Sequence, residues 1–446
     1  MKKMKVISLL IVFAMILCMA AACSNNGSKD SDNSSSPPPA TSPNAPVDDK
    51  KPEDDKTTEN NPAPVEAIAG ELGMYDETRD YNANKKFKVE YVLLQTSTIA
   101  EGWNRAFAQW ATLSNVEYLG LTEFGGDADA FMMSLPSIAG RCDGLILDPD
   151  QQMFTRIKEV LADLNTPWMS AMALPLNMEV EPLENGSYPL LNPYAGYNQR
   201  YIGEQLATNL VDSAQKLWPD VPLDDYGFIV VDYSVGFALH DRTIGAQTWL
   251  EKNHPEFMSD KRFFTADTAI ATWDIDTSRD VVTTVLSMNP SIENWLIIGI
   301  VESMAQGAAI AVDAFGFTDT TYITAFGAEG ARVMWDAGQS SAWRTSGSSA
   351  FMVVTEPIFF ALYSFMMGEA TPDTIWREWV NEAAGETYPS RLVPFFFVTQ
   401  ENYKKVFAWS DVYAGADLFP QYAEERTQVD RNTYSARTAV PEWFKN

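Results

Sequence analysis

Short apolar runs alternate with amphipathic helical patterns from about residue 85 onward, and this alternation constrains the fold more than any other feature. Buried strands are predicted at 87–94, 144–147, 167–171, 227–231, 295–300, 322–326, 341–345 and 394–398. Helices are predicted between them at 103–113, 153–164, 200–218, 243–253, 278–288, 303–315 and 351–367. Strands that alternate with helices form parallel sheets covered on both faces. We therefore predict an α/β protein, whose roughly 360 folded residues suit two doubly wound, Rossmann-like lobes.

The first 22 residues have the pattern of a signal peptide. Three lysines (Lys2, Lys3 and Lys5) precede an apolar run that ends in small residues. This run is shorter than the ~20 apolar residues that a membrane-spanning helix needs, and a polar, acidic segment follows it. The sequence therefore predicts an exported protein.

The stretch MAAAC that ends at Cys23 resembles a lipobox, in which the cysteine is acylated and becomes the mature N-terminus. This resemblance implies a lipoprotein anchored by acyl chains such as palmitate on the extracytoplasmic face of the cell membrane. The alternative is an ordinary cleavage site that contains a cysteine. Cys18 would leave with the signal, so Cys142 has no disulfide partner and is expected to be a buried, inert thiol.

Residues 23–84 are rich in Ser, Pro, Asn, Asp, Lys and Glu and have almost no aliphatic clusters. Such a segment cannot bury enough apolar surface to offset the entropy lost on ordering. We expect a disordered linker between the anchor and the folded part.

Charge and motifs argue against several classes of function. The net charge of −28 argues against nucleic acid and anionic lipid surfaces as partners. The chain has two histidines, and no His, Cys or carboxylate pair has the spacing of a zinc site. Phosphate-binding glycine loops and the Gly-x-Ser-x-Gly motif are also absent from the sequence. We expect no enzyme, metal or cofactor; His240 beside Asp241 is a weak candidate acid-base group, better interpreted as a surface or capping residue.

The order of segments resembles the type I periplasmic binding proteins, in particular the ribose, arabinose and galactose group of ABC importers. The resemblance covers about residues 85–390 and is carried by segments such as KFKVEYVLLQTSTIAEGWNRAFAQWA, RCDGLILDPDQQ, YNQRYIGEQLATNLVD and FIVVDYSVGFALHDRTIGAQTWLEKN. It implies two lobes joined by a three-strand hinge, with crossings near 191–195, 344–348 and 391–396. The N-terminal lobe would comprise 85–193 and 347–391, and the C-terminal lobe 194–346 and 392–446.

The resemblance also implies ligand-binding residues. Trp103 matches the aromatic residue that opens the first helix and stacks on a sugar face, and Trp273 matches its counterpart on the other lobe. Arg242 matches the arginine that donates hydrogen bonds to ring and hydroxyl oxygens.

Three polar positions of the family pattern differ in this chain. Val301-Glu302 replaces Asn-Asp, Phe326-Gly327 replaces Phe-Asp, and Met172 stands where an acid is usual. Polar residues at strand ends, namely Gln95, Asn192, Glu329 and Ser346, are candidates to replace these groups. With the residues that match or stand at positions of the family pattern, the expected ligand contacts are Trp103, Arg242, Trp273, Gln95, Met172, Asn192, Glu329 and Ser346. These changes suggest a modified, less hydroxylated or larger solute than a simple pentose.

We therefore predict a monomeric, lipid-anchored solute-binding protein that closes around a sugar-like molecule and presents it to an ABC permease. A second hypothesis keeps the fold but makes the protein a sensor that presents its solute to a membrane receptor or histidine kinase. A third is an envelope enzyme, for which the sequence offers only His240 and scattered carboxylates.

Overall fold

The computed structural model describes residues 71–95, 98–171, 173–184, 186–259, 261–269, 271–380, 387–393 and 395–429. The predicted signal peptide, Cys23 and most of the predicted linker lie outside these residues. Among the described helices, none combines the length and apolar character required to cross a membrane.

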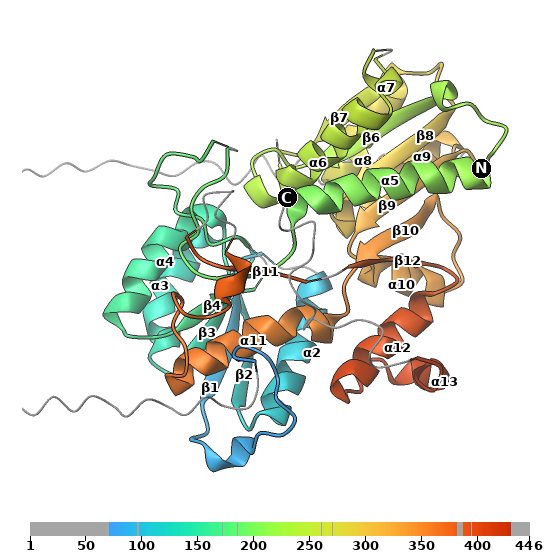
Figure 1. Cartoon of the computed structure of the whole chain (residues 1–446). Helices are drawn as coiled ribbons and strands as arrows, with labels where there is room; N and C mark the ends of the chain where they lie inside the picture. Colours follow the sequence, from blue (N-terminus) through green and yellow to red (C-terminus); the bar gives the residue numbers. More distant parts are fainter. Residues whose placement is uncertain are drawn as a thin grey trace, which may run out of the picture. The chain divides into compact units, whose positions relative to one another are not determined.

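The first sheet has four parallel strands in the order β2-β1-β3-β4. These are β1 (Lys88–Leu93), β2 (Glu117–Glu123), β3 (Gly144–Asp148) and β4 (Trp168–Ser170). Its helices are α2 (Thr98–Leu113), α3 (Ala128–Ala139), α4 (Phe154–Asp163) and α11 (Phe351–Met367) (Figure 1).

Strand β1 shows why both faces of this sheet are covered. Successive side chains on a strand point to opposite faces. Val89 and Tyr91 join the apolar cluster that contains α2 and α11, whereas Val92 joins the cluster that contains α3 and α4. Because both faces are buried, five successive residues of the strand are buried, including Glu90, which is paired with Arg141.

The second sheet has six strands in the order β12-β10-β9-β8-β6-β7, of which only β12 is antiparallel to its neighbour. The strands are β6 (Tyr226–Asp232), β7 (Phe263–Asp267), β8 (Asn294–Gly299), β9 (Thr321–Phe326), β10 (Trp343–Ser348) and β12 (Phe396–Thr399). Its helices are α5 (Gln199–Leu217), α6 (Phe237–Asn253), α7 (Glu256–Ser259), α8 (Ile275–Met288), α9 (Glu302–Phe315) and α10 (Glu329–Asp336). Helices α5 and α6 pack together, as do α8 and α9.

Two of the predicted crossings pair with each other. The strands β5 (Tyr194–Gly196) and β11 (Ser390–Leu392) form a separate two-stranded parallel sheet. The remaining passage between the sheets is short, since β10 belongs to the second sheet and α11, which contacts β3 and β4, begins three residues later. Three passages of the chain therefore connect the two sheets.

The predicted boundary of the disordered linker at residue 84 is wrong, because residues 71–84 pack on the first lobe. Tyr81 is buried in a short 3-10 helix, η1 (Tyr81–Ala83), and stacks edge-on against Tyr363. Arg79 forms a two-pronged ion pair with Glu369 at 2.7 and 2.9 Å. Residues 71–84 therefore belong to the folded part rather than to the linker.

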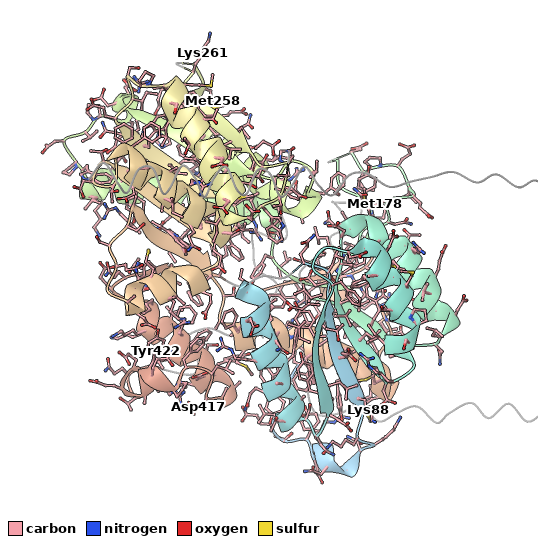
Figure 2. The ribbon with its side chains drawn as sticks, turned by 180° about the vertical axis from the view of Figure 1, so that it is seen from behind. Lys88, Met178, Met258, Lys261, Asp417 and Tyr422 are labelled. Carbon is pink, nitrogen blue, oxygen red and sulfur yellow. The ribbon has the colours of Figure 1, made fainter. Side chains whose placement is uncertain are left out.

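The carboxyl-terminal segment also packs on the body. It contains α12 (Tyr403–Ala414), η6 (Pro420–Tyr422) and α13 (Ala423–Arg426). Figure 2 labels Tyr422 in this segment. The Tyr422 hydroxyl donates to Asp336 of α10 at 2.7 Å, while Phe419 stacks on Phe351 of α11. This segment therefore contacts α11 of the first lobe as well as α10 of the second, whereas the sequence placed it with the second lobe alone.

Candidate functional site

The carboxyl ends of the parallel strands are where this class of sheet binds ligands, and Arg242 reaches one of these ends. Its side chain is 3% exposed. Nε donates to Oε1 of Gln199 at 2.8 Å, and Nη1 donates to the carbonyl of Ile300, just after β8, at 2.5 Å. The guanidinium lies 4.4 Å from the ring centroid of Phe326, at the end of β9. Neutral groups from three elements thus fix its orientation.

Burial also changes the acidity of this group. Removal from water lowers the pKa of Arg242 to about 10, and the described residues offer no ion pair to offset this effect. Arg242 nevertheless stays charged at neutral pH, because its pKa remains well above 7.

A close crossing of α5 and α6 places Arg242 beside Gln199. A Cβ at Gly203 of α5 would lie 1.9 Å from the carbonyl oxygen of Arg242, and one at Gly245 of α6 would lie 2.0 Å from that of Arg200. Only glycine permits backbones to approach so closely. The two glycines therefore set the geometry of the arginine site.

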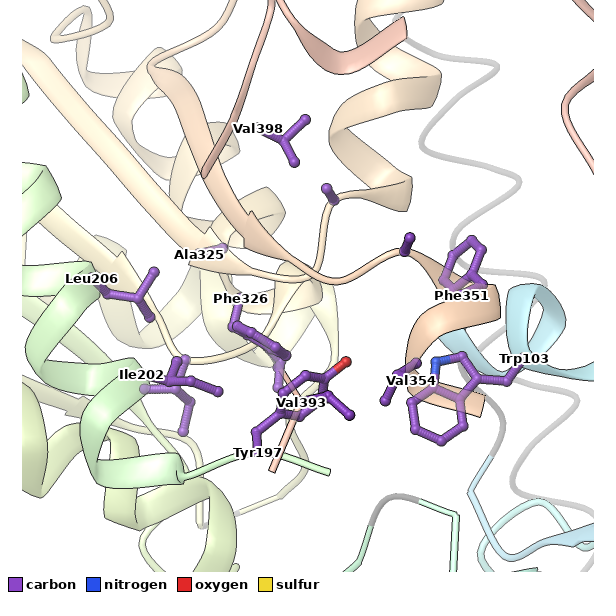
Figure 3. Packing of buried hydrophobic residues seen from close by; sticks show 14 of the residues in the cluster. Trp103, Tyr197, Ile202, Leu206, Ala325, Phe326, Phe351, Val354, Val393 and Val398 are labelled. Atoms are coloured by element: carbon purple, nitrogen blue, oxygen red, sulfur yellow. The ribbon is translucent and has the colours of Figure 1, made fainter. Parts of the chain in front are cut away.

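Gln199 continues the network into the connection between the sheets. Its Nε2 donates to the hydroxyl of Tyr194 on β5 at 3.4 Å, and the amide of Tyr197 donates to the same hydroxyl at 3.0 Å. The ring of Tyr197 packs edge-on against Phe326 at 4.8 Å (Figure 3). The surroundings of Arg242 are thus aromatic and uncharged.

His240 is paired with Asp232 in a contact that stabilises the local fold. Its Nδ1 lies 2.8 Å from Asp232 Oδ2, at the end of β6, and Thr243 donates to the other oxygen at 2.7 Å. The same carboxylate accepts from the backbone amide of Tyr233. Asp232 therefore fixes the turn that leads into α6, and the described residues contain no cluster of His, Cys, Asp and Glu able to hold a metal.

Trp273 lies in the loop before α8 and is half-buried. Its ring stacks on Tyr233 with centroids 6.5 Å apart and planes 24° apart. The Ser303 hydroxyl donates to its backbone carbonyl at 2.7 Å. A fixed, partly exposed aromatic face of this kind suits the apolar face of a ring-shaped solute.

Trp103 is placed differently from Trp273. It is 2% exposed and packs edge-on against Phe107 within α2. Figure 3 shows it beside Val354 of α11. Ligand contact at Trp103 requires that part of this apolar packing open.

The polar residues proposed from strand ends lie in several different environments. Gln95 is exposed after β1, and Met172 lies outside the described residues. Asn192 is buried and donates to the carbonyl of Trp168 at 3.4 Å, while Ser346 is buried within β10 and accepts from Trp343 Nε1 at 2.9 Å. The structure thus gives Asn192 and Ser346 internal partners.

Glu329 and Glu302 also have protein partners. Glu329 forms a two-pronged ion pair with Arg332 at 2.6 and 2.9 Å and lies 3.8 Å from Arg105 of α2. Glu302 is buried and accepts from the amide of Gly330 at 3.0 Å. Both acids therefore already have partners within the protein.

Several solved structures share this arrangement. An ABC transporter periplasmic solute-binding protein from Actinobacillus succinogenes 130z with bound D-allose matches with a TM-score of 0.54 at 14% identity, over 71% of this chain and 99% of that one. One from Bacillus halodurans C-125 with bound myo-inositol matches with a TM-score of 0.52 at 16% identity, over 72% and 98%. The chain has the type I periplasmic binding protein fold.

This fold is also found in a twin-arginine translocation pathway signal protein from Burkholderia phytofirmans, with a TM-score of 0.56 at 14% identity over 80% of this chain and 100% of that one. No protein-family model matches the sequence, and no curated protein sequence matches it. The predicted fold class, two parallel-sheet lobes of the type I binding protein fold, is therefore confirmed at the level of fold.

Within this binding-protein fold, the sequence prediction missed the residues that surround Arg242. Gln199, Tyr194 and Tyr197 lie in or just after the predicted crossing at 191–195. Their position could have identified them as site candidates, because a segment that crosses between lobes must pass near the place where the lobes meet. Two tyrosines and a glutamine beside such a segment are groups able to surround a ligand or an arginine. Phe326 was noted only as part of an altered motif, although it supplies the face under the guanidinium.

Cys142 is only partly buried, whereas the sequence predicted a buried, inert thiol. Burial, with a smaller contribution from Glu90, raises the pKa of Cys142 to about 12, so its thiol is protonated at neutral pH.

Asp148 should make stability depend on pH. It ends β3, and removal from water raises its pKa to about 7, an effect that hydrogen bonding only partly offsets. A raised pKa means that the folded state holds this proton more tightly than the unfolded state, so stability should fall as pH rises from about 4 to about 7. Asp148→Asn cannot ionise. Thermal melts should therefore show the variant well above wild type at pH 8 and by a much smaller margin at pH 5; the same difference at both pH values would exclude this titration.

Proposed function

We propose that this chain is the solute-binding lipoprotein of an ABC importer, and that it binds a sugar or sugar-like molecule between its two lobes. The observation that carries this proposal is the buried Arg242, held by neutral partners at the carboxyl ends of β8 and β9. Its fixed guanidinium is suited to donate hydrogen bonds to a bound solute, and Trp273 offers an aromatic face. The structural neighbours with bound D-allose and myo-inositol support the choice of solute class.

The proposed mechanism is lobe closure without covalent chemistry. The solute would favour the closed state because contacts from both lobes exist together only there. The paired strands β5 and β11 and the passage after β10 are the segments about which the lobes would move. The closed form would then be the one that the permease recognises.

A thermal-shift screen with sugars, sugar acids, polyols and nucleosides tests solute binding. A ligand at a hundred times its dissociation constant stabilises the folded state by about 2.7 kcal/mol. At least one carbohydrate class should therefore raise the melting temperature by several degrees. If every class leaves the melting temperature unchanged, the carbohydrate assignment is contradicted.

The proposed lipid anchor makes a separate prediction. Cys23→Ala removes the acylated thiol, so the protein should leave the membrane fraction when cells are fractionated. Cys142→Ala is the control, because Cys142 is a free cysteine of the folded body, just before β3. Equal membrane association of Cys23→Ala and wild type would refute the anchor.

A further inference from the structure

Two arginines are almost fully buried among the described residues, and they differ in one respect. Arg391 is 1% exposed and forms an ion pair with Glu71. Arg242 is 3% exposed and forms no ion pair with any described residue. Three partly buried arginines follow the first pattern, and their partners are carboxylates: Arg79 with Glu369, Arg332 with Glu329, and Arg426 with Asp411. Arg262 and Arg344 are more exposed than Arg242 and donate to backbone carbonyls.

The lack of a carboxylate at Arg242 is unexpected for this chain. The sequence has 60 acidic and 32 basic residues, so acids are plentiful. A buried charge without a counter-charge is costly, and an arginine cannot escape the cost by losing its proton at neutral pH. The contacts of Arg242 leave this charge uncompensated, since the acceptors are an amide oxygen of Gln199 and the carbonyl of Ile300.

The guanidinium retains hydrogen-bonding capacity as well as charge. Nε and Nη1 have protein acceptors, and no described residue accepts from Nη2. Phe326 covers one face of the group, so further polar contacts must come in its plane. A planar oxyanion matches this geometry.

We propose that the solute carries a carboxylate that pairs with Arg242. This inference rests on the proposed function and narrows the solute from carbohydrates in general to sugar acids. A carboxylate fits better than a phosphate dianion because one guanidinium balances one negative charge. The imidazole on the same helix, His240, is already bound to the Asp232 carboxylate and supplies no second free cation.

Calorimetry with matched pairs of sugars tests the proposal on the full protein. D-galacturonate and D-glucuronate should each be compared with D-galactose and D-glucose at neutral pH. In at least one pair the acid should bind about tenfold tighter or more than its neutral partner. Equal or tighter binding of the neutral sugars would overturn the carboxylate assignment and leave carbohydrate binding intact. Failure of all four sugars to bind would overturn the carboxylate assignment. The proposal of carbohydrate binding would be contradicted only if the broader thermal-shift screen were also negative.

Variants identify the group responsible for the preference. Arg242→Gln should remove the preference for the acid. Arg344→Gln is the matched control, since Arg344 is partly buried and donates to the carbonyl of Thr318 before β9, at the opposite end of the sheet. It removes one positive charge and should keep the preference. A preference that survives in Arg242→Gln would assign the carboxylate to another residue.

Discussion

Replacing Gly203 with alanine is expected to lower the free energy of unfolding by about 3 kcal/mol, the upper end of the usual cost of overpacking. The new Cβ would lie 1.9 Å from the carbonyl oxygen of Arg242, which is backbone and cannot rotate away. Helices α5 and α6 would have to separate, and Gln199 would move relative to Arg242. Urea denaturation measures the change.

Gly330→Ala is the control for this effect. Gly330 lies in α10, and a Cβ there meets nothing closer than 3.5 Å. Alanine is the better helix former, so this variant should be unchanged or more stable by up to about 1 kcal/mol. If Gly203→Ala unfolds at the same urea concentration as wild type, the close crossing of α5 and α6 is wrong.

Arg242→Met is expected to weaken solute binding strongly while leaving the free energy of unfolding nearly unchanged. Loss of the hydrogen bonds that a charged guanidinium donates to the solute should weaken binding by roughly 10- to 150-fold. The unliganded fold should change little, because two effects nearly cancel. Removing the buried charge should stabilise the folded state by about 3 kcal/mol, the free energy that corresponds to the lowered pKa of Arg242. Losing two hydrogen bonds to neutral acceptors costs about 1 kcal/mol each.

Calorimetry and urea denaturation on the same preparation check this prediction. The expected result is a large loss of affinity with a free energy of unfolding within about 1 kcal/mol of wild type. A variant that binds as wild type does would remove Arg242 from the site. A variant that is strongly destabilised would show that the arginine supports the fold rather than the solute.

The central strands could be predicted from sequence because both of their faces are buried. Strands β3, β6 and β8 have central apolar runs, and β1 and β9 are also largely buried although they contain polar residues such as Glu90 and Thr324. The edge strands β2 and β7 were missed because they are only partly buried and carry polar residues. Helix α3 contains Pro136, and α10 has only eight residues, so neither has a long helical pattern.

The folded segment before β1 was assigned to the linker because of its polar composition. Residues 71–84 are mostly polar, and their order depends on partners about 280 residues away in the chain, such as Glu356 and Glu369. Pattern analysis of a single segment does not detect contacts of this kind. Ser346 was misplaced for a different reason, because its partner Trp343 lies on the same strand and the direction of the Ser346 side chain into the interior is not evident from the sequence.

The arginine site was only partly predictable. Arg242 was found through the resemblance, while its partners Gln199 and Ile300 follow from helix crossing and strand register, which the sequence does not reveal residue by residue. Glu329 carries a charge suited to a ligand, but in the structure it is paired with Arg332, three residues later in the chain. A polar residue at a strand end is therefore a site candidate only when its neighbours leave it available.

A crystal structure of the wild-type protein with the tightest-binding carbohydrate from the thermal-shift screen tests the central claim most directly. We expect density between the two lobes, with a solute oxygen about 2.7–3.1 Å from a guanidinium nitrogen of Arg242 and a ring face against Trp273. A solute bound elsewhere, with Arg242 contacting only Gln199, Ile300 and Phe326, would contradict the account.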